Sequence, residues 1–107
     1  MGLYHSVGIT YGFEIPADTD IDAIDLALFG QPNTPDSVGY LVIGDRDQLL
    51  LVTEVQQVKE NQVVPLTDEY YTRPELAQWL VALHEAAVRM GCPDHPLPAW
   101  LVVHNYR

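Results

Sequence analysis

Residues 72–91 constrain the fold more than any other stretch, because they predict one long amphipathic helix. Apolar side chains recur there every three or four residues, the spacing that collects them on one helical face. Thr72 and Glu75 have the spacing of an N-terminal capping box, while Gly91 and Pro93 favour an end at residue 91. The apolar face comprises Leu76, Trp79, Leu80, Leu83, Ala87 and Met90. The rest of the chain is therefore expected to supply a surface for this face to cover.

Strand patterns account for most of the remaining apolar residues. Residues 3–15 alternate between the two sides of a strand, and Gly8 and Gly12 share one side. These glycines predict either a bend or the close approach of another segment. Residues 38–44 and 48–58 have the pattern of a β-hairpin, and residues 99–106 predict a final strand.

A shorter helix is expected between the first two strands, ending near Phe29. Asp18 or Thr19 is expected to cap its start, and Gly30 follows its end. Its buried face would comprise Ile21, Ile24 and Leu28. The resulting order of strand, helix, strand, strand, helix and strand predicts a single α+β domain over residues 1–107.

This order of elements is that of the ferredoxin-like arrangement, a four-stranded antiparallel sheet with two helices on one face. Right-handed crossovers would then place the first and last strands side by side. In the alternative, residues 62–66 add a short fifth strand to an α+β meander, and Pro65 confines that strand to the edge of the sheet.

Charge and cysteine usage restrict the partners and the compartment. The chain has 107 residues and a formal net charge of −10. This charge disfavours binding to nucleic-acid phosphates and anionic membranes, and it permits a basic partner. The favoured alternative is that the charge only keeps a small protein soluble. Cys92 is the single cysteine, so no intramolecular disulfide forms, which favours a cytoplasmic location. We expect neither a signal peptide nor a membrane span.

The candidate binding residues lie in the longest connection, directly before the main helix. Residues 65–72 are acidic and aromatic, and long connections often bind ligands or partners. We predict a binding surface formed by Asp68, Glu69, Tyr70 and Tyr71. For Tyr71 a structural role is also open, and we favour it: the ring would pack as a hydrophobic staple on the first turn of the helix.

Two arrangements of histidines are the other candidates. Cys92 and His95 have the spacing of two zinc ligands, and His84 lies one to two helical turns earlier. Half of a ligand pattern is weak evidence, so we favour a small buried cysteine and a solvated histidine, and predict no metal or cofactor. His5 and His104 would be neighbours if the first and last strands pair antiparallel. A core histidine with a hydrogen-bond partner is favoured there over a role in proton transfer.

Function is predicted mainly by exclusion. The sequence has no G-x-S-x-G elbow, no glycine-rich phosphate loop and no H-E-x-x-H motif, so no residue is assigned a catalytic role. We expect a small, acidic, non-enzymatic module that binds or regulates a protein partner or a second copy of itself. Such a chain fits an accessory or inhibitor protein of a bacterium or phage. The alternative is a ligand-binding domain or enzyme with a pocket between sheet and helices, lined by His5, Tyr11, Trp79 and Trp100.

Overall fold

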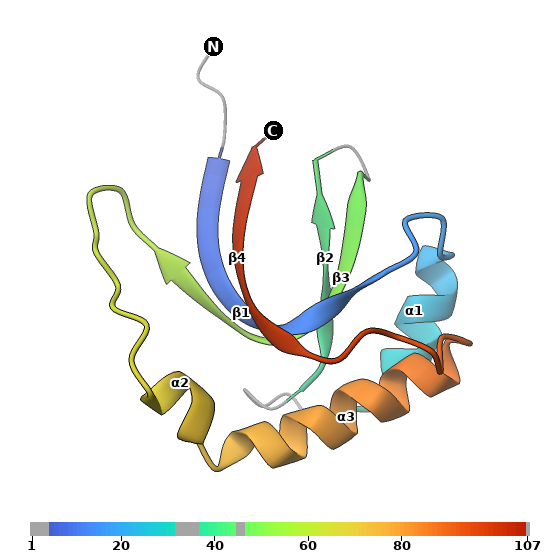
Figure 1. The fold of residues 1–107 in the computed structure, drawn as a ribbon. Coiled ribbons are helices and arrows are strands. Elements are labelled where there is room, and N and C mark those ends of the chain that lie inside the picture. The colour runs from blue at the N-terminus through green and yellow to red at the C-terminus, as the bar shows by residue number, and fades with distance from the viewer. Residues whose placement is uncertain (1–4, 32–36, 45–46, 107) are drawn as a thin grey trace.

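Four strands form one antiparallel sheet in the computed structural model, which describes residues 5–31, 37–44 and 47–106. The strands are β1 (His5–Ile15), β2 (Gly39–Ile43), β3 (Gln48–Val58) and β4 (Ala99–Tyr106), and the helices are α1 (Ile21–Leu28), α2 (Glu69–Thr72) and α3 (Glu75–Arg89). The sheet order is β2-β3-β1-β4 (Figure 1). The expected α+β class is confirmed, and so is the pairing of the first strand with the last.

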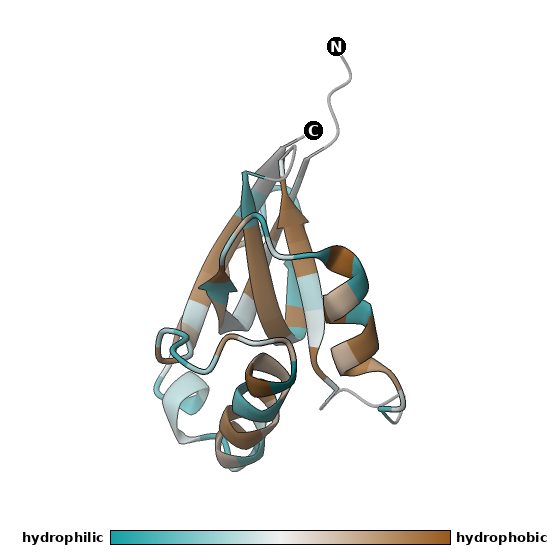
Figure 2. Ribbon diagram, turned by 90° about the vertical axis from the view of Figure 1, so that its right-hand side faces the viewer, coloured by the Kyte–Doolittle hydropathy of each residue, from teal (hydrophilic) through white to brown (hydrophobic). Residues whose placement is uncertain are grey.

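The main core lies between the sheet and the helices α1 and α3. Phe13 pairs with Leu51 across the two central strands, so both side chains project toward the helices. The buried members of the main core are Phe13, Ile15, Ile24, Val38, Leu49, Leu51, Leu83, Ala86 and Ala87. Figure 2 shows long apolar stretches along the strands and alternating apolar and hydrophilic bands along α3, as expected for a helix with one buried face. None of the described helices has the length and apolarity needed to cross a lipid bilayer.

The pairing register of the two central strands, β1 and β3, shifts at one point. Thr10 pairs with Val55 and Gly12 pairs with Val52, so two residue steps along β1 lie opposite three along β3. β3 therefore carries one extra residue, a β-bulge. Before this bulge the odd-numbered residues of β3 face the helices, and after it the even-numbered ones do. The bulge therefore turns Glu54 and Gln56 toward the helix-covered face.

Gly12 permits this distortion because it has no side chain. A Cβ atom at this position would overlap the carbonyl oxygen of Leu51 and lie 2.8 Å from the Cα atom of Val52. Only glycine allows two backbones to approach so closely. The predicted close approach is thus confirmed at Gly12. At Gly8, an added Cβ would meet the Val55 side chain at 3.2 Å, which is a milder contact.

The face of the sheet opposite the helices is also buried in its middle. Thr10, Leu50 and Val52 have exposed fractions of 0%, 7% and 2%, although they project away from the main core. Residues from both outer strands, including Ile43 of β2 and Leu101 of β4, line one hollow of about 240 Å³ on this side. The sheet therefore curls toward this face, and Figure 1 shows β1 and β4 bending together along their length.

The predicted main helix is confirmed as α3, which begins at Glu75 rather than after Thr72, and a separate short helix, α2, precedes it. The predicted capping box is wrong. The Thr72 hydroxyl bonds the carbonyl oxygen of Asp68 at 3.2 Å, and Glu75 accepts from Arg73 instead. The cause is Pro74, whose ring disfavours helical backbone in the preceding residue. Arg73 accordingly has extended backbone, with φ −61° and ψ 133°.

The end of α3 follows the prediction. Gly91 has a φ of +86°, in the left-handed region that glycine adopts freely. The backbone N–H of the next residue, Cys92, donates to the carbonyl oxygen of Ala87 at 2.8 Å. The chain therefore turns sharply away from the helix axis after its last turn.

Two smaller predictions are corrected. The α1 cap is Asp20, whose carboxylate accepts from the N–H of Asp22 at 3.0 Å, rather than Asp18 or Thr19. Residues 62–66 are not a strand, because the chain turns at residues 59–62 and leaves the sheet through Asn61 in left-handed backbone. Residues 3 and 4, the predicted start of the first strand, lie outside the described residues.

We predict that Gly12→Ala lowers the free energy of unfolding by roughly 3 kcal/mol, because the added methyl group forces β1 and β3 apart. Urea denaturation followed by tryptophan fluorescence measures the change. Gly39→Ala is the matched control, since it is a strand glycine whose added Cβ meets no atom within 4 Å. We expect the control to change stability by less than about 1 kcal/mol. Equal effects of the two substitutions would contradict the role given to Gly12.

Candidate functional site

Tyr70 anchors the predicted binding segment to the sheet. Its hydroxyl donates to Gln56 Oε1 at 2.9 Å, and its carbonyl oxygen accepts from the indole N–H of Trp100. Its ring meets Trp100 edge to face at a centroid distance of 5.0 Å and an interplanar angle of 88°. Tyr70 is therefore a structural residue of the α2 segment, which is defined here as residues 65–72.

Tyr71 has the opposite environment, with 67% of its surface exposed. The predicted staple is wrong, because successive residues of a helix point about 100° apart and only one tyrosine of α2 can face the sheet. Asp68 and Glu69 are exposed beside it, and Leu66 is 52% exposed. The α2 segment thus presents apolar and acidic side chains together, on a backbone that Tyr70 holds in place.

Arg73 completes the attachment of this segment. Its Nη1 donates to Glu54 Oε2 at 2.8 Å and its Nε donates to Glu75 Oε2 at 2.8 Å. The guanidinium also lies 4.7 Å from the centre of the Trp79 ring, a cation–π contact. The hydrogen bonds with Glu54 and Glu75 raise the pKa of Arg73, and the two carboxylates offset its positive charge.

Aromatic rings fill the space where the pocket between sheet and helices was expected. Tyr11 lies 6.1 Å from Trp79 and 5.3 Å from Trp100, measured between ring centres. Trp79 is 1% exposed, and burial raises the pKa of Tyr11. The side chain of His5 lies outside the part of the chain that the structure describes. These contacts favour a packed aromatic core at this position over a ligand pocket.

The residues that hold the α2 segment are Glu54, Gln56, Arg73 and Trp100, and the sequence alone predicts this role for none of them. The bulge that turns the first two toward the segment lies between Val52 and Val55, which project to the same face of the sheet although they are three residues apart. The valine pattern does not reveal this shift, because Val55 and Val58 lie in a regular stretch and face opposite sides.

The structure does not pair His5 of β1 directly with His104 of β4. In the β1–β4 register, His104 lies opposite Val7, and His5 lies opposite Tyr106. The two histidine positions are thus diagonal neighbours along the paired strands. His104 is exposed.

At the other end of α3, His84 and His95 are joined through their rings. The Nδ1 atom of His84 lies 2.8 Å from the Nε2 atom of His95. The Nδ1 atom of His95 lies 2.7 Å from the carbonyl oxygen of Pro96, which can only accept, so this nitrogen carries a proton. The His95 ring also stacks on Phe13 at 4.2 Å with an angle of 10°. His95 is therefore a fixed, half-buried residue rather than a solvated one.

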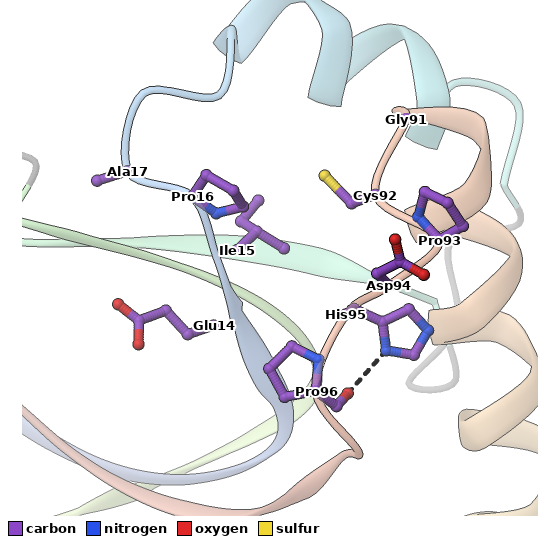
Figure 3. Close-up of a pocket in the computed structure, with 10 residues that line it drawn as sticks. All are labelled: Glu14, Ile15, Pro16, Ala17, Gly91, Cys92, Pro93, Asp94, His95 and Pro96. Carbon is purple, nitrogen blue, oxygen red and sulfur yellow. Dashed lines mark hydrogen bonds between the residues drawn. The ribbon is translucent and has the colours of Figure 1, made fainter.

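A pocket of about 470 Å³ lies beside this turn, between residues 14–17 at the end of β1 and residues 91–96 (Figure 3). We call it the turn pocket. Figure 3 shows the Cys92 sulfur directed toward Pro16, and the Glu14 carboxylate directed away from residues 91–96. Among the described residues, no three histidine, cysteine, aspartate or glutamate side chains converge to hold a metal ion.

Comparison with family models, with characterised proteins and with solved structures finds no match.

We predict that the two adjacent tyrosines differ sharply in their contribution to stability. Tyr70→Ala removes the contacts with Gln56 and Trp100 and should lower the free energy of unfolding by roughly 2 kcal/mol. Tyr71→Ala is the matched control and should change it by less than about 0.5 kcal/mol. Thermal and urea unfolding measure both variants. A Tyr71→Ala variant as unstable as Tyr70→Ala would show that the exposed ring has a structural role.

Proposed function

We propose that this chain is a non-enzymatic protein-binding or regulatory module that contacts a basic partner through the α2 segment. One observation carries the proposal: Tyr71 and Leu66 are more than half exposed, on a segment that is itself anchored to the sheet. Tyrosine and leucine exposed to water favour contact with another protein. An anchored segment loses little conformational entropy on binding, so more of the contact energy contributes to affinity.

The charge of this surface indicates the chemistry of the partner. Asp68 and Glu69 are exposed beside Tyr71, while the nearest arginine, Arg73, is neutralised by Glu54 and Glu75. The chain as a whole carries a net charge of −10, which attracts a basic surface over long distances and repels phosphate backbones. The partner is therefore a basic protein surface rather than a nucleic acid.

The remaining parts of this proposal are its biological setting and the class of fold. A small acidic module of this kind suits an accessory or inhibitor protein of a bacterium or phage, and its single cysteine suits the cytoplasm.

We also propose that the fold is ferredoxin-like. The sheet order β2-β3-β1-β4 supports this, since each helical connection joins two strands that flank a third.

The experiment places a photoreactive benzoylphenylalanine at Tyr71 and irradiates the protein in an extract of its source cells. A basic protein should crosslink at this position, and the yield should fall as the salt concentration rises. The control places the same residue at Phe29, which is 85% exposed at the end of α1. Asp68→Lys with Glu69→Lys should abolish crosslinking at Tyr71, whereas Asp25→Lys with Glu60→Lys should preserve it. Equal crosslinking at Tyr71 and Phe29 would refute the proposed surface.

Self-association through β4 is a second candidate, favoured by the character of that strand. β4 is an outer strand of the described sheet and contains no charged residue. Val102 in its centre is 66% exposed. Outer strands that remain monomeric usually carry lysine, proline or a bulge, and β4 carries none of these in its pairing with β1. Two copies of an acidic chain would meet with least repulsion at this uncharged edge.

We predict that Val102→Lys shifts any dimer of the protein to monomer, because a charged edge strand cannot pair with its own copy. Sedimentation velocity over a range of protein concentrations measures the shift. Val81→Lys is the control, since Val81 is 55% exposed on α3, away from β4. A wild-type protein that stays monomeric at every concentration, or a dimer that survives Val102→Lys, excludes this mode of assembly.

A further inference from the structure

We propose that the turn pocket binds a small organic cation with an apolar body, of the class of protonated arylalkylamines. The pocket has a volume of about 470 Å³, within the range of roughly 300 to 1,000 Å³ that is usual for small-molecule sites. This inference does not depend on the proposed protein-binding surface, which lies at the opposite end of α3. A helix of 15 residues separates the two ends by about 22 Å.

The walls of the pocket are apolar and already in place. Ile15 is 2% exposed in the core, and Pro16, Pro93 and Pro96 contribute rings whose backbone φ angles are fixed. The turn itself is held by the hydrogen bond from the N–H of Cys92 to the last turn of α3. A ligand therefore meets a preformed apolar surface and does not have to order a loop, which reduces the cost of binding.

His95 stiffens the same turn from its other side. Both of its ring nitrogens have partners, the carbonyl oxygen of Pro96 at 2.7 Å and the ring of His84 at 2.8 Å. The face of the ring is covered by Phe13. The ring therefore serves as a wall of the pocket, and no nitrogen of His95 is left over to bind an anion.

The charges around the pocket all have one sign. Asp94 is exposed on the turn that forms one side of it, and none of the residues that line it is lysine or arginine. The carbonyl end of α3 adds partial negative charge, since the pocket begins directly after its last turn. The Glu14 side chain projects toward the other face of the sheet, where it accepts a hydrogen bond of 3.4 Å from Gln48, so Asp94 is the carboxylate that meets an ammonium group.

The one arginine at this end of the helix is directed elsewhere. Arg89 Nη1 donates to the carbonyl oxygen of Ala27 at 3.3 Å, and its Nη2 lies 3.7 Å from Glu85 Oε2. It therefore does not neutralise Glu14 or Asp94. A ligand that combines an ammonium group with an apolar body matches both the charge and the walls, whereas an anion of the same shape matches only the walls.

The test uses three probes of one shape, phenethylammonium, 2-phenylethanol and 3-phenylpropanoate, each titrated into the full-length chain. Amide chemical shifts in ¹⁵N-labelled protein identify the site and give the dissociation constant. We expect the cation to shift amides of residues 14–17 and 91–96, and to bind at least about tenfold more tightly than the alcohol. The anion should bind more weakly than either. Shifts scattered over the whole surface, or equal affinity for the three probes, would overturn the proposal.

Matched charge variants separate a local effect from the general acidity of the chain. Asp94→Asn should reduce the preference for the cation over the alcohol to less than about threefold. Asp68→Asn changes the net charge equally, at an exposed position away from the pocket, and should leave the preference intact. A control variant that lowers cation binding as much as Asp94→Asn shows non-specific attraction, and the proposal then fails.

Cys92 provides a second measurement, because it is the single cysteine and lines the pocket. Bound phenethylammonium should slow the reaction of its thiol with iodoacetamide, and the protection should follow the dissociation constant found by NMR. Tyr71→Ala should leave this protection unchanged, which keeps the result separate from the protein-binding surface. Unchanged thiol reactivity at saturating phenethylammonium would place the probe outside the pocket and contradict the assignment.

Discussion

The contact between Gly12 and the backbone of Leu51 is the constraint on which the rest of the fold depends. With no side chain between them, the two central strands approach closely enough for β3 to gain one residue against β1. The bulge increases the local bend of the sheet. That bend buries Thr10, Leu50 and Val52 on the side that no described helix covers. One missing side chain thus determines both the curvature of the sheet and the burial of its second face.

The extra residue also decides which side chains meet the helices. Without it, Val55 would continue the helix-facing row of β3, and the segment before α3 would rest on an apolar strand. With it, Glu54 and Gln56 face that segment, and they hold Arg73 and Tyr70 through hydrogen bonds of 2.8 and 2.9 Å. Half-buried polar partners of this kind fix one orientation of a segment, because hydrogen bonds are directional, whereas an apolar contact tolerates sliding. The placement of the α2 segment therefore follows from the bulge.

The sequence predicts those features that depend on repeated patterns, and it fails at features that depend on one contact. The strands, the hairpin and most of the apolar face of α3 follow from periodicity, as does the end of α3 at Gly91, although Leu80 of the predicted face is 44% exposed. For Tyr71 the sequence favours a staple and for Tyr70 it leaves the role open, because both have the same local chemistry. Only the position of Trp100, which lies far along the chain, decides which ring packs against the sheet. The turn pocket was missed as a cavity because it needs the end of β1 against residues 91–96, although its histidine and cysteine had been singled out.

The two ends of α3 share an electrostatic character that has a structural cause. Each end has one arginine, and each arginine is bound to a carboxylate of the protein itself, Arg73 to Glu54 and Glu75 and Arg89 to Glu85. Each positive charge thus has a carboxylate of the same chain beside it, and the other acidic residues at each end remain exposed. What distinguishes the two ends is shape. The α2 segment projects exposed side chains and suits a broad surface, whereas the turn pocket is concave and walled by proline rings. The same charge bias therefore favours a macromolecule at one end of the helix and a small molecule at the other.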